Sequence, residues 1–226
     1  MNEARFLSDV GCHVMDVIRD DGLYRHIRFH VPGTMGMHFD LITWPGYLCY
    51  TGDMGTYVFC RLHDMFQFFR TDCKYAQECG RRLGINLGYW SEKLEAVDGR
   101  QRSGGAKEFS AAKFRRVIEE WRVRWIREAR GRLTKEQRRS LWEAVRDDVI
   151  DHIEDGEHGA YAAARDFSWS VSGDRWSGGH VWEFEDLWDH DFTEYTHRFQ
   201  WCCYALAWGI ETYDAAKVSA SEEVTA

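Results

Sequence analysis

Three residues near the C-terminal end of the chain have the types and spacing of metal ligands. His190, Glu194 and His197 lie at offsets of four and seven, which places them on one face of a helix if the segment is helical. Glu194-x-x-His197 has the spacing found in carboxylate-bridged di-iron bundles, but those sites need a second such motif. The nearest counterpart, 155–158, is interrupted by Gly156. The competing interpretation is a capped helix start whose histidines hydrogen-bond locally, so we assign no metal and no cofactor.

A second group of carboxylates and imidazoles occupies residues 147–158. Asp148 and His152 are one helical turn apart and could share a divalent cation. Acids at the C-terminal end of a helix oppose its macrodipole. A solvated acidic helix end remains the simpler interpretation, and an enzymatic role for the chain stays open but is not favoured.

The segment 113–139 is rich in arginine. Arg122, Arg124 and Arg127 are interleaved with Trp121 and Trp125. Arginine with aromatic residues suits nucleic-acid phosphates, and its planar fork also suits carboxylates at protein interfaces. Three interpretations therefore stay open: binding of nucleic acid, a partner interface, or neutralisation by acidic residues of the same chain.

The charge of the chain is unevenly distributed. Residues 1–101 carry a net charge of −2, residues 102–146 of +8 and residues 147–226 of −14, within a total of −8. Such asymmetry favours internal pairing of the arginines. An acidic, aromatic-rich surface can also imitate nucleic-acid phosphates toward a basic partner. Asp186, Asp189 and Asp191 are our candidate partner contacts on that surface.

The elements that would position these residues indicate an α+β fold. Short apolar runs punctuated by glycine predict an N-terminal antiparallel meander of three or four strands within 1–63, followed by helical segments in 64–98. Apolar residues at helical spacing predict an antiparallel helical hairpin, with Thr134 and Gln137 forming a capping box. A final helix, apolar nearly all round, is expected to begin near Asp191 and to be buried.

Composition predicts three segments within one compact molecule. They are a β-meander with short helices at 1–100, a basic helical hairpin at 101–155, and an acidic, aromatic-rich region at 156–226 that packs back on the first. The best linker candidate is 100–105, which is rich in glycine and polar residues.

Several classes of protein are disfavoured by what the sequence lacks. It contains no phosphate loop, dinucleotide-binding glycine fingerprint, His-Glu-x-x-His motif or nucleophile elbow. No apolar run has the roughly 18 residues of a membrane span, and the first residues do not form a signal peptide. Seven cysteines, an odd number without Cys-x-x-Cys spacing, favour reduced thiols in a cytoplasm.

Two stretches of the chain resemble a family of uncharacterised proteins encoded by phages and prophages. The first comprises 33–48 and 52–59, and the second surrounds 199–201 and 207–210. The resemblance implies a bacterial cytoplasm as the setting, and no catalytic residue is carried over. Accessory proteins of phages often inhibit host defence systems, CRISPR complexes among them, by occluding a nucleic-acid site. The resulting hypothesis is a non-enzymatic inhibitor that binds a host protein complex; a nucleic-acid-binding protein and a metal-dependent enzyme are the alternatives.

Overall fold

The computed structural model describes residues 1–34, 36–78, 82–98, 105–171 and 180–225. The chain divides into two compact units. The first, unit 1, comprises Met1–Glu108 and Tyr195–Ala226, and the second, unit 2, comprises Phe109–Glu194. Unit 2 is therefore an insertion into unit 1.

Unit 1 is built on a six-stranded antiparallel sheet in which neighbours in sequence are neighbours in space. Its strands are β1 (Val14–Asp21), β2 (Tyr24–His30), β3 (Phe39–Trp44), β4 (Tyr47–Gly52), β5 (Gly55–Cys60) and β6 (Leu94–Val97). Pro45 and Gly46 make the two-residue turn between β3 and β4, and Gly46 has a φ of 87°, a conformation that favours glycine. Short turns of this kind fix the register of each pair.

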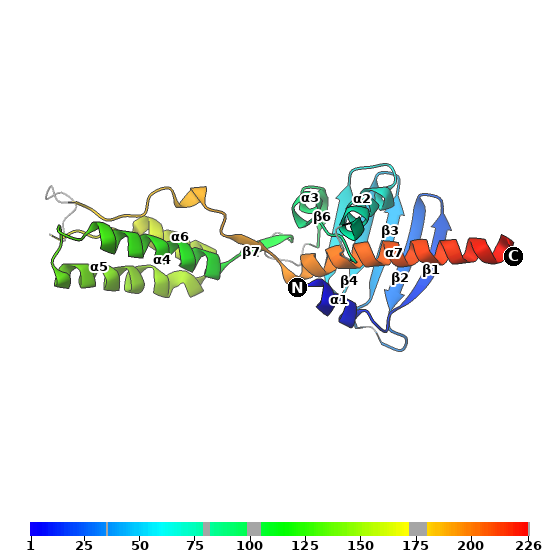
Figure 1. Cartoon of the computed structure of the whole chain (residues 1–226), viewed down its shortest axis with the longest axis horizontal. Helices are drawn as coiled ribbons and strands as arrows, with labels where there is room; N and C mark the ends of the chain where they lie inside the picture. The colour runs from blue at the N-terminus through cyan, green and yellow to red at the C-terminus, as the bar shows by residue number, and fades with distance from the viewer. Residues whose placement is uncertain (35, 79–81, 99–104, 172–179, 226) are drawn as a thin grey trace. The chain divides into compact units, whose positions relative to one another are not determined.

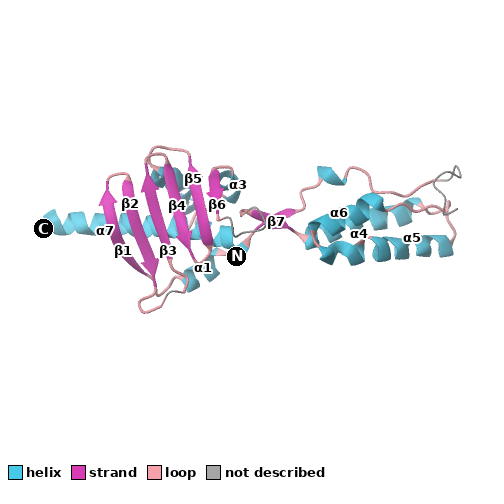
Figure 2. Cartoon of the chain, turned by 180° about the vertical axis from the view of Figure 1, so that it is seen from behind, coloured by secondary structure: helices cyan, strands magenta, loops and turns pink. Residues whose placement is uncertain are grey.

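Helices cover one face of this sheet (Figure 1). They are α1 (Glu3–Asp9), α2 (Met65–Glu78), α3 (Leu87–Ser91) and α7 (His197–Thr225). Alternate strand residues such as Phe29, Phe39 and Leu41 are fully buried beneath α7. The helix comes so close at Gly209 that a Cβ atom there would lie 3.0 Å from Leu41 Cδ1 and 3.1 Å from Phe29 Cε2. Seen from behind, the opposite face of the sheet has no helix in front of it among the described residues (Figure 2).

Unit 2 is mainly helical. The chain enters it through β7 (Lys107–Phe109) and leaves through β8 (Thr193–Tyr195), which pair as a two-stranded sheet. Between them lie α4 (Ala111–Glu128), α5 (Lys135–Asp148), η1 (Ile150–Asp155), α6 (Glu157–Asp166) and η2 (Leu187–Asp189). Apolar stripes of α4, α5 and α6 meet in a second core that contains Phe114, Trp125 and Val145.

The α+β class is confirmed, and so is the capping box of α5, in which Thr134 and Gln137 each bond the other's backbone. The meander has more strands than expected, because β1 and β6 extend it on both sides. Leu94 and Val97, expected to be helical, lie in β6. The second helix of the hairpin predicted within 101–155 ends at Asp148, and a 3-10 helix follows it to Asp155.

The final helix begins later than predicted, at His197 and not near Asp191. The intervening residues 193–195 form β8, and Thr196 Oγ1 accepts a hydrogen bond from Phe199 N at 3.1 Å, as an N-cap does. The predicted boundary between the first and second segments, near residue 100, lies in 99–104, outside the described residues. Residue 155 lies inside unit 2, and the region 156–226 contributes to both units.

Candidate partner-binding surface

The segment 182–192 runs along the helices of unit 2 and is held there by four apolar side chains. Trp182, Phe184, Leu187 and Phe192 are each at least nine-tenths buried. The ring of Phe184 lies 4.6 Å from that of Trp125 on α4, measured between centroids. Aromatic contacts of this kind bury large areas in specific geometry, so the segment is a fixed part of unit 2.

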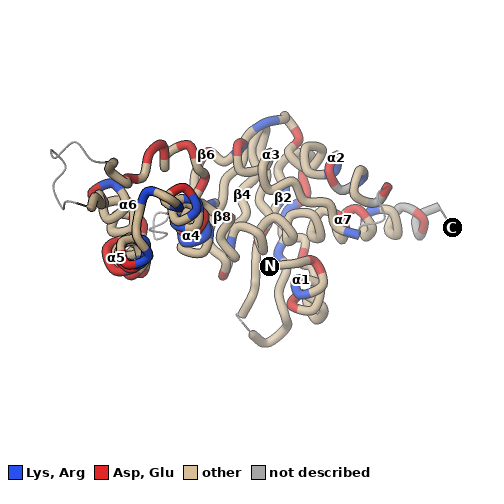
Figure 3. The backbone as a smooth tube through the Cα atoms, turned by 60° about the vertical axis from the view of Figure 1, so that its left-hand side comes forward, with Lys and Arg blue, Asp and Glu red and all other residues tan. Residues whose placement is uncertain are grey.

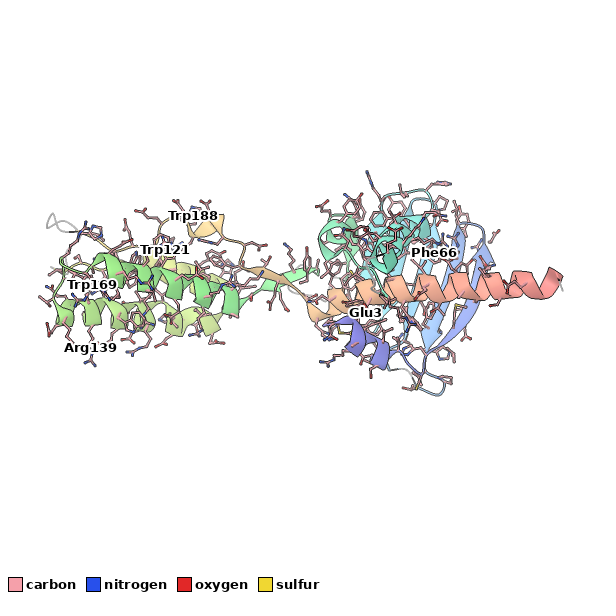
Figure 4. The ribbon with its side chains drawn as sticks, viewed as in Figure 1. Glu3, Phe66, Trp121, Arg139, Trp169 and Trp188 are labelled. Carbon is pink, nitrogen blue, oxygen red and sulfur yellow. The ribbon has the colours of Figure 1, made fainter. Side chains whose placement is uncertain are left out.

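Trp188 projects from this fixed segment into solvent. Its side chain is 70% exposed, although its neighbour Leu187 is buried. Asp186, just before η2, has φ 54° and ψ 32° in the left-handed region, a conformation that costs a non-glycine residue about 1–2 kcal/mol. The backbone thus turns so that Leu187 anchors the segment while Trp188 faces outward, as Figure 4 shows. Strained backbone and an exposed large aromatic often mark binding sites.

Carboxylates surround Trp188 in sequence and share its exposure. Glu185, Asp186, Asp189 and Asp191 are all exposed, and the segment 180–194 contains no Lys or Arg. Figure 3 shows acidic residues following one another along this part of unit 2. Asp191 also has a local role, because its Oδ1 accepts hydrogen bonds from Thr193 N at 2.9 Å and Thr193 Oγ1 at 2.6 Å. The predicted acidic contacts therefore lie in one short segment, with a tryptophan at its centre that sequence reasoning missed.

The signal for Trp188 was present in the sequence. Trp188 lies between Asp186 and Asp189 in the sequence. The rings of Trp182, Phe184 and Phe192, by contrast, are buried in the core of unit 2. A tryptophan that is flanked closely by carboxylates on an irregular segment is a candidate for exposure, because charged side chains are almost never fully buried unless paired.

The three predicted arginine contacts do not form one surface. Arg122 is 6% exposed, whereas Arg124 and Arg127 are exposed. The guanidinium of Arg124 lies 4.8 Å from the centroid of the Trp121 ring. Arg122 instead donates from Nη1 to both carboxylate oxygens of Glu119 at 3.1 Å, so its charge is satisfied inside unit 2.

The exposed face of α4 carries both signs of charge. It borders a shallow open pocket of about 680 Å³ around Val123. The charged residues that line it are Arg116, Arg124 and Arg127 together with Glu119, Glu120 and Glu128. Three carboxylates beside three guanidinium groups weaken the attraction of this face for phosphates.

The basic side chains of the hairpin pair chiefly with acids close in sequence. Examples are Arg139 with Glu143 at 2.9 Å and Arg146 with Asp147 at 2.7 Å. Arg115 and Glu154, 3.6 Å apart, connect α4 to η1. Internal neutralisation is therefore mainly local, and the Arg115–Glu154 pair adds one contact between elements that are distant in sequence.

The structure does not bring the predicted metal ligands together on a helix. His190 follows η2, Glu194 lies in β8 and His197 begins α7. Asp148 and His152 do line one pocket of about 390 Å³, and His152 Nδ1 lies 3.0 Å from Asp155 Oδ2. In the described part of the chain, no group of three or more His, Cys, Asp or Glu side chains is arranged to hold a metal ion.

A second polar cluster, also missed from sequence, lies on the helix-free face of the sheet. Asp40 is buried there, and accepts hydrogen bonds from Arg28 Nε and Nη2, both at 2.9 Å. The His26 Nε2 atom lies 2.7 Å from Asp40 Oδ2. Burial alone would raise the pKa of Asp40, but the bonds from Arg28 and His26 outweigh it and lower the pKa below the usual 3.8. The cluster thus holds an ionised carboxylate that ties β2 to β3.

The thiol of Cys49 lies close enough to this cluster to feel the charge of Asp40. Burial, reinforced by the charge of Asp40, raises its pKa above 9.0. The neutral thiol that results is a poor nucleophile, and the Sγ atom donates to the Tyr50 carbonyl oxygen at 3.7 Å. This favours a structural role for the cluster.

Comparison with protein-family models, with curated proteins and with solved structures finds no match to this chain. Among the described residues, no helix combines the length and the apolar character needed to cross a membrane.

Proposed function

We propose that this chain is a non-enzymatic binding protein that docks the acidic segment around Trp188 onto a basic surface of a partner protein. The observation that carries the proposal is a tryptophan that is 70% exposed on a well-anchored turn between carboxylates. Tryptophan is enriched among the residues that dominate binding energy at interfaces. Leaving it in water forgoes roughly 2–3 kcal/mol of burial free energy, which a partner with an apolar pocket would recover.

The carboxylates define the chemistry of that partner. Like-charged groups at Glu185, Asp186 and Asp189 attract a surface rich in Lys and Arg, accelerating association and selecting against acidic partners. Basic protein surfaces of this kind commonly bind nucleic acids. This chemistry supports the hypothesis of an inhibitor that covers the nucleic-acid site of a host defence complex, in the setting that the phage resemblance implies.

The anchoring of the segment favours binding without folding. Because Leu187 and Phe192 are already buried in the core of unit 2, little conformational entropy is lost when the surface docks. Preorganisation of this kind raises affinity without new contacts.

The test is affinity capture from nuclease-treated bacterial lysate that contains active defence systems. The wild-type chain is expected to retain a stoichiometric basic protein, and Trp188→Ala is expected to lose it. Tyr75→Ala is the matched control, because Tyr75 is an aromatic residue of unit 1 with 63% exposure. Circular dichroism of the three proteins verifies that each is folded.

A second variant tests the charge. Asp186→Asn combined with Asp189→Lys is expected to slow association and to make it less dependent on salt. Retention of the same partner by both this variant and Trp188→Ala would contradict the proposed surface. Capture from untreated lysate that is absent from nuclease-treated lysate would point instead to nucleic acid as the ligand.

A further inference from the structure

β1 is the outer strand of the sheet in unit 1, and its eight residues include both exposed apolar and exposed charged side chains. Its neighbour on one side is β2, and no described strand pairs with its other edge. Val14, Val17 and Ile18 are 40%, 47% and 54% exposed. Unpaired backbone groups along such an edge are a template for another strand.

An irregularity in β1 restricts how another strand could pair with it. Val17 is opposite Ile27 and Arg19 is opposite His26, so Ile18 is an extra residue. When Val17 and Ile18 together oppose Ile27, as the two residues of a bulge oppose one residue of the partner strand, both lie on the same side of the sheet. Ile27 is a core residue, so this is the helix-covered side. Asp16, which lies opposite Arg28, and Arg19 are consequently both on the helix-free side.

A second copy of β1 can pair antiparallel with the first, related to it by a two-fold axis that passes between Val17 and Ile18. In this register, side chains that lie next to each other across the two strands point to the same side of the sheet. In a regular strand this register is impossible, because adjacent residues point to opposite faces. The bulge removes the conflict, since it gives Val17 and Ile18 the same side. The register then places Val17 beside Ile18 of the second copy and Asp16 beside Arg19 of the second copy. If the two-fold axis passed through another point of β1, the bulge of each strand would lie opposite regular backbone of the other. Some neighbouring side chains of the two strands would then point to opposite faces of the sheet.

The chemistry of this pairing is self-complementary. Two Asp16–Arg19 pairs would form on one face and two Val17–Ile18 contacts on the other. Cross-strand pairs of both kinds stabilise antiparallel strands. Within the chain, Asp16 pairs with His30 at 2.8 Å and Arg19 pairs with Asp21 at 3.2 Å. Their side chains are still 58% and 57% exposed, so each can also contact an added strand.

The end of α7 reaches over the place that the added strand would occupy. Tyr213 Oη donates to Asp20 Oδ1 at 2.8 Å and Lys217 pairs with Asp20, so α7 crosses β1 at these residues. The helix continues to Thr225 and projects past β1 in Figure 1. Eight further residues at 1.5 Å each extend about 12 Å, roughly the width of two strands.

One apolar side chain at the start of this projecting end is exposed. Val218 is 56% exposed at its start. In the two-fold register, Asp20 lies beside Met15 of the second copy, which also faces the helix-covered side. A second copy would therefore give Val218 an apolar neighbour.

We infer that β1 is the interface through which two copies of this chain associate into a two-fold dimer with a continuous sheet. The occupant of the edge is a second copy, because its β1 matches both the bulge and the charges of Asp16 and Arg19. This interface lies in unit 1 and is separate from the Trp188 surface of unit 2.

The test is the mass of the full chain in solution by sedimentation and light scattering over a range of concentrations. The wild type is expected to reach twice the 26.6 kDa of one chain. Arg19→Glu is expected to weaken the dimer at least tenfold, since the introduced carboxylate would face Asp16 of the second copy. Combining it with Asp16→Arg restores opposite charges at the same positions, and is expected to restore the dimer.

Two further variants separate loss of the interface from loss of the fold. Ile18→Lys is expected to give a folded monomer, whereas Leu62→Lys, at an exposed apolar residue of unit 1 outside β1, is expected to stay dimeric. Circular dichroism and thermal unfolding confirm that each variant is folded. A wild type that remains monomeric up to about 100 μM, or a dimer that survives both Arg19→Glu and Ile18→Lys, would overturn the inference.

Discussion

The guanidinium carbon of Arg122 lies 3.6 Å from the centroid of the Trp142 ring, and its Nε and Nη2 atoms donate to the Trp142 carbonyl oxygen at 3.0 and 2.8 Å. Arg122 of α4 thus contacts both the ring and the backbone of Trp142 in α5. A stacked, fork-shaped contact of this kind is specific to arginine. It is one reason why the two helices of the hairpin keep a fixed alignment.

Replacing Arg122 should therefore destabilise unit 2 and leave charge-driven binding largely unchanged. Arg122→Ala is expected to lower the free energy of unfolding by about 2–4 kcal/mol, because a buried charge-assisted contact is lost and Glu119 is left unpaired. Urea denaturation followed by circular dichroism measures the change. The control Arg124→Ala removes an exposed guanidinium and should alter stability by at most about 0.5 kcal/mol. Equal stability of the two variants would show that the Trp142 contact is unimportant.

The buried carboxylate of Asp40 should make stability depend on pH in acid. Its pKa is lowered in the folded protein, so the ionised form stabilises the fold above pH 3.8 and this contribution is lost as the pH falls further. Asp40→Asn is expected to cost about 1.5–3 kcal/mol at pH 7, because the bonds to a charged acceptor are weakened.

The measurement is urea denaturation of both proteins at pH 7 and near pH 3. The gap between wild type and Asp40→Asn should narrow at the lower pH, where the wild-type carboxyl takes up its proton. A gap that stays constant with pH would mean that the charge of Asp40 does not contribute.

The thiols of unit 1 should report on the opening of its core. Cys202 and Cys203 on α7 are fully buried, and burial raises the pKa of both well above 9.0. Neither should react with iodoacetamide at pH 8 while the protein is folded, whereas exposed Cys12 should react readily. Mass spectrometry of the labelled peptides, with and without urea, distinguishes the three sites. Labelling of Cys202 in the native protein at the rate of Cys12 would be incompatible with a closed core.

Unit 2 should be removable without loss of unit 1. Its two ends lie side by side, because Ser110 N donates to the Phe192 carbonyl oxygen at 2.7 Å. Replacing 109–194 by a short Gly-Ser linker is therefore expected to leave a protein with a cooperative thermal transition and buried Trp201 fluorescence. A shortened chain that is molten or aggregated would show that unit 1 requires the insertion.

The elements that were predicted best from the sequence have a strong local pattern of residue types. β2 to β5 carry alternating apolar residues and glycine turns, and the Thr134 capping box has a local pattern that needs no tertiary information. β1 gave no such signal, because as an outer strand it has few buried residues. The start of α7 was misplaced because the pairing of β8 with β7, a contact distant in sequence, overrides the local helical pattern.

Part of the candidate sites was also predictable from residue types, and the rest depends on tertiary contacts. The acidic character of 186–191 follows directly from residue types, and so that part of the surface was predictable. Burial of Arg122 was not, because nothing in an arginine-rich helix indicates which side chain faces Trp142. The Asp40 cluster depends on the registers of β2 with β3, which sequence alone does not specify.

The insertion of unit 2 before α7 also sets the order in which the protein can acquire its structure during synthesis. All strands of the large sheet leave the ribosome before the helix that covers them, and the whole of 109–194 is translated in between. At about 5–20 residues per second, the interval from Val97 to Tyr213 is on the order of ten seconds. Unit 2 is synthesised completely within that time, while Phe29, Phe39 and Leu41 still lack the cover of α7. The nascent chain therefore presents an aromatic sheet face to chaperones, and this exposure ends only when α7 docks.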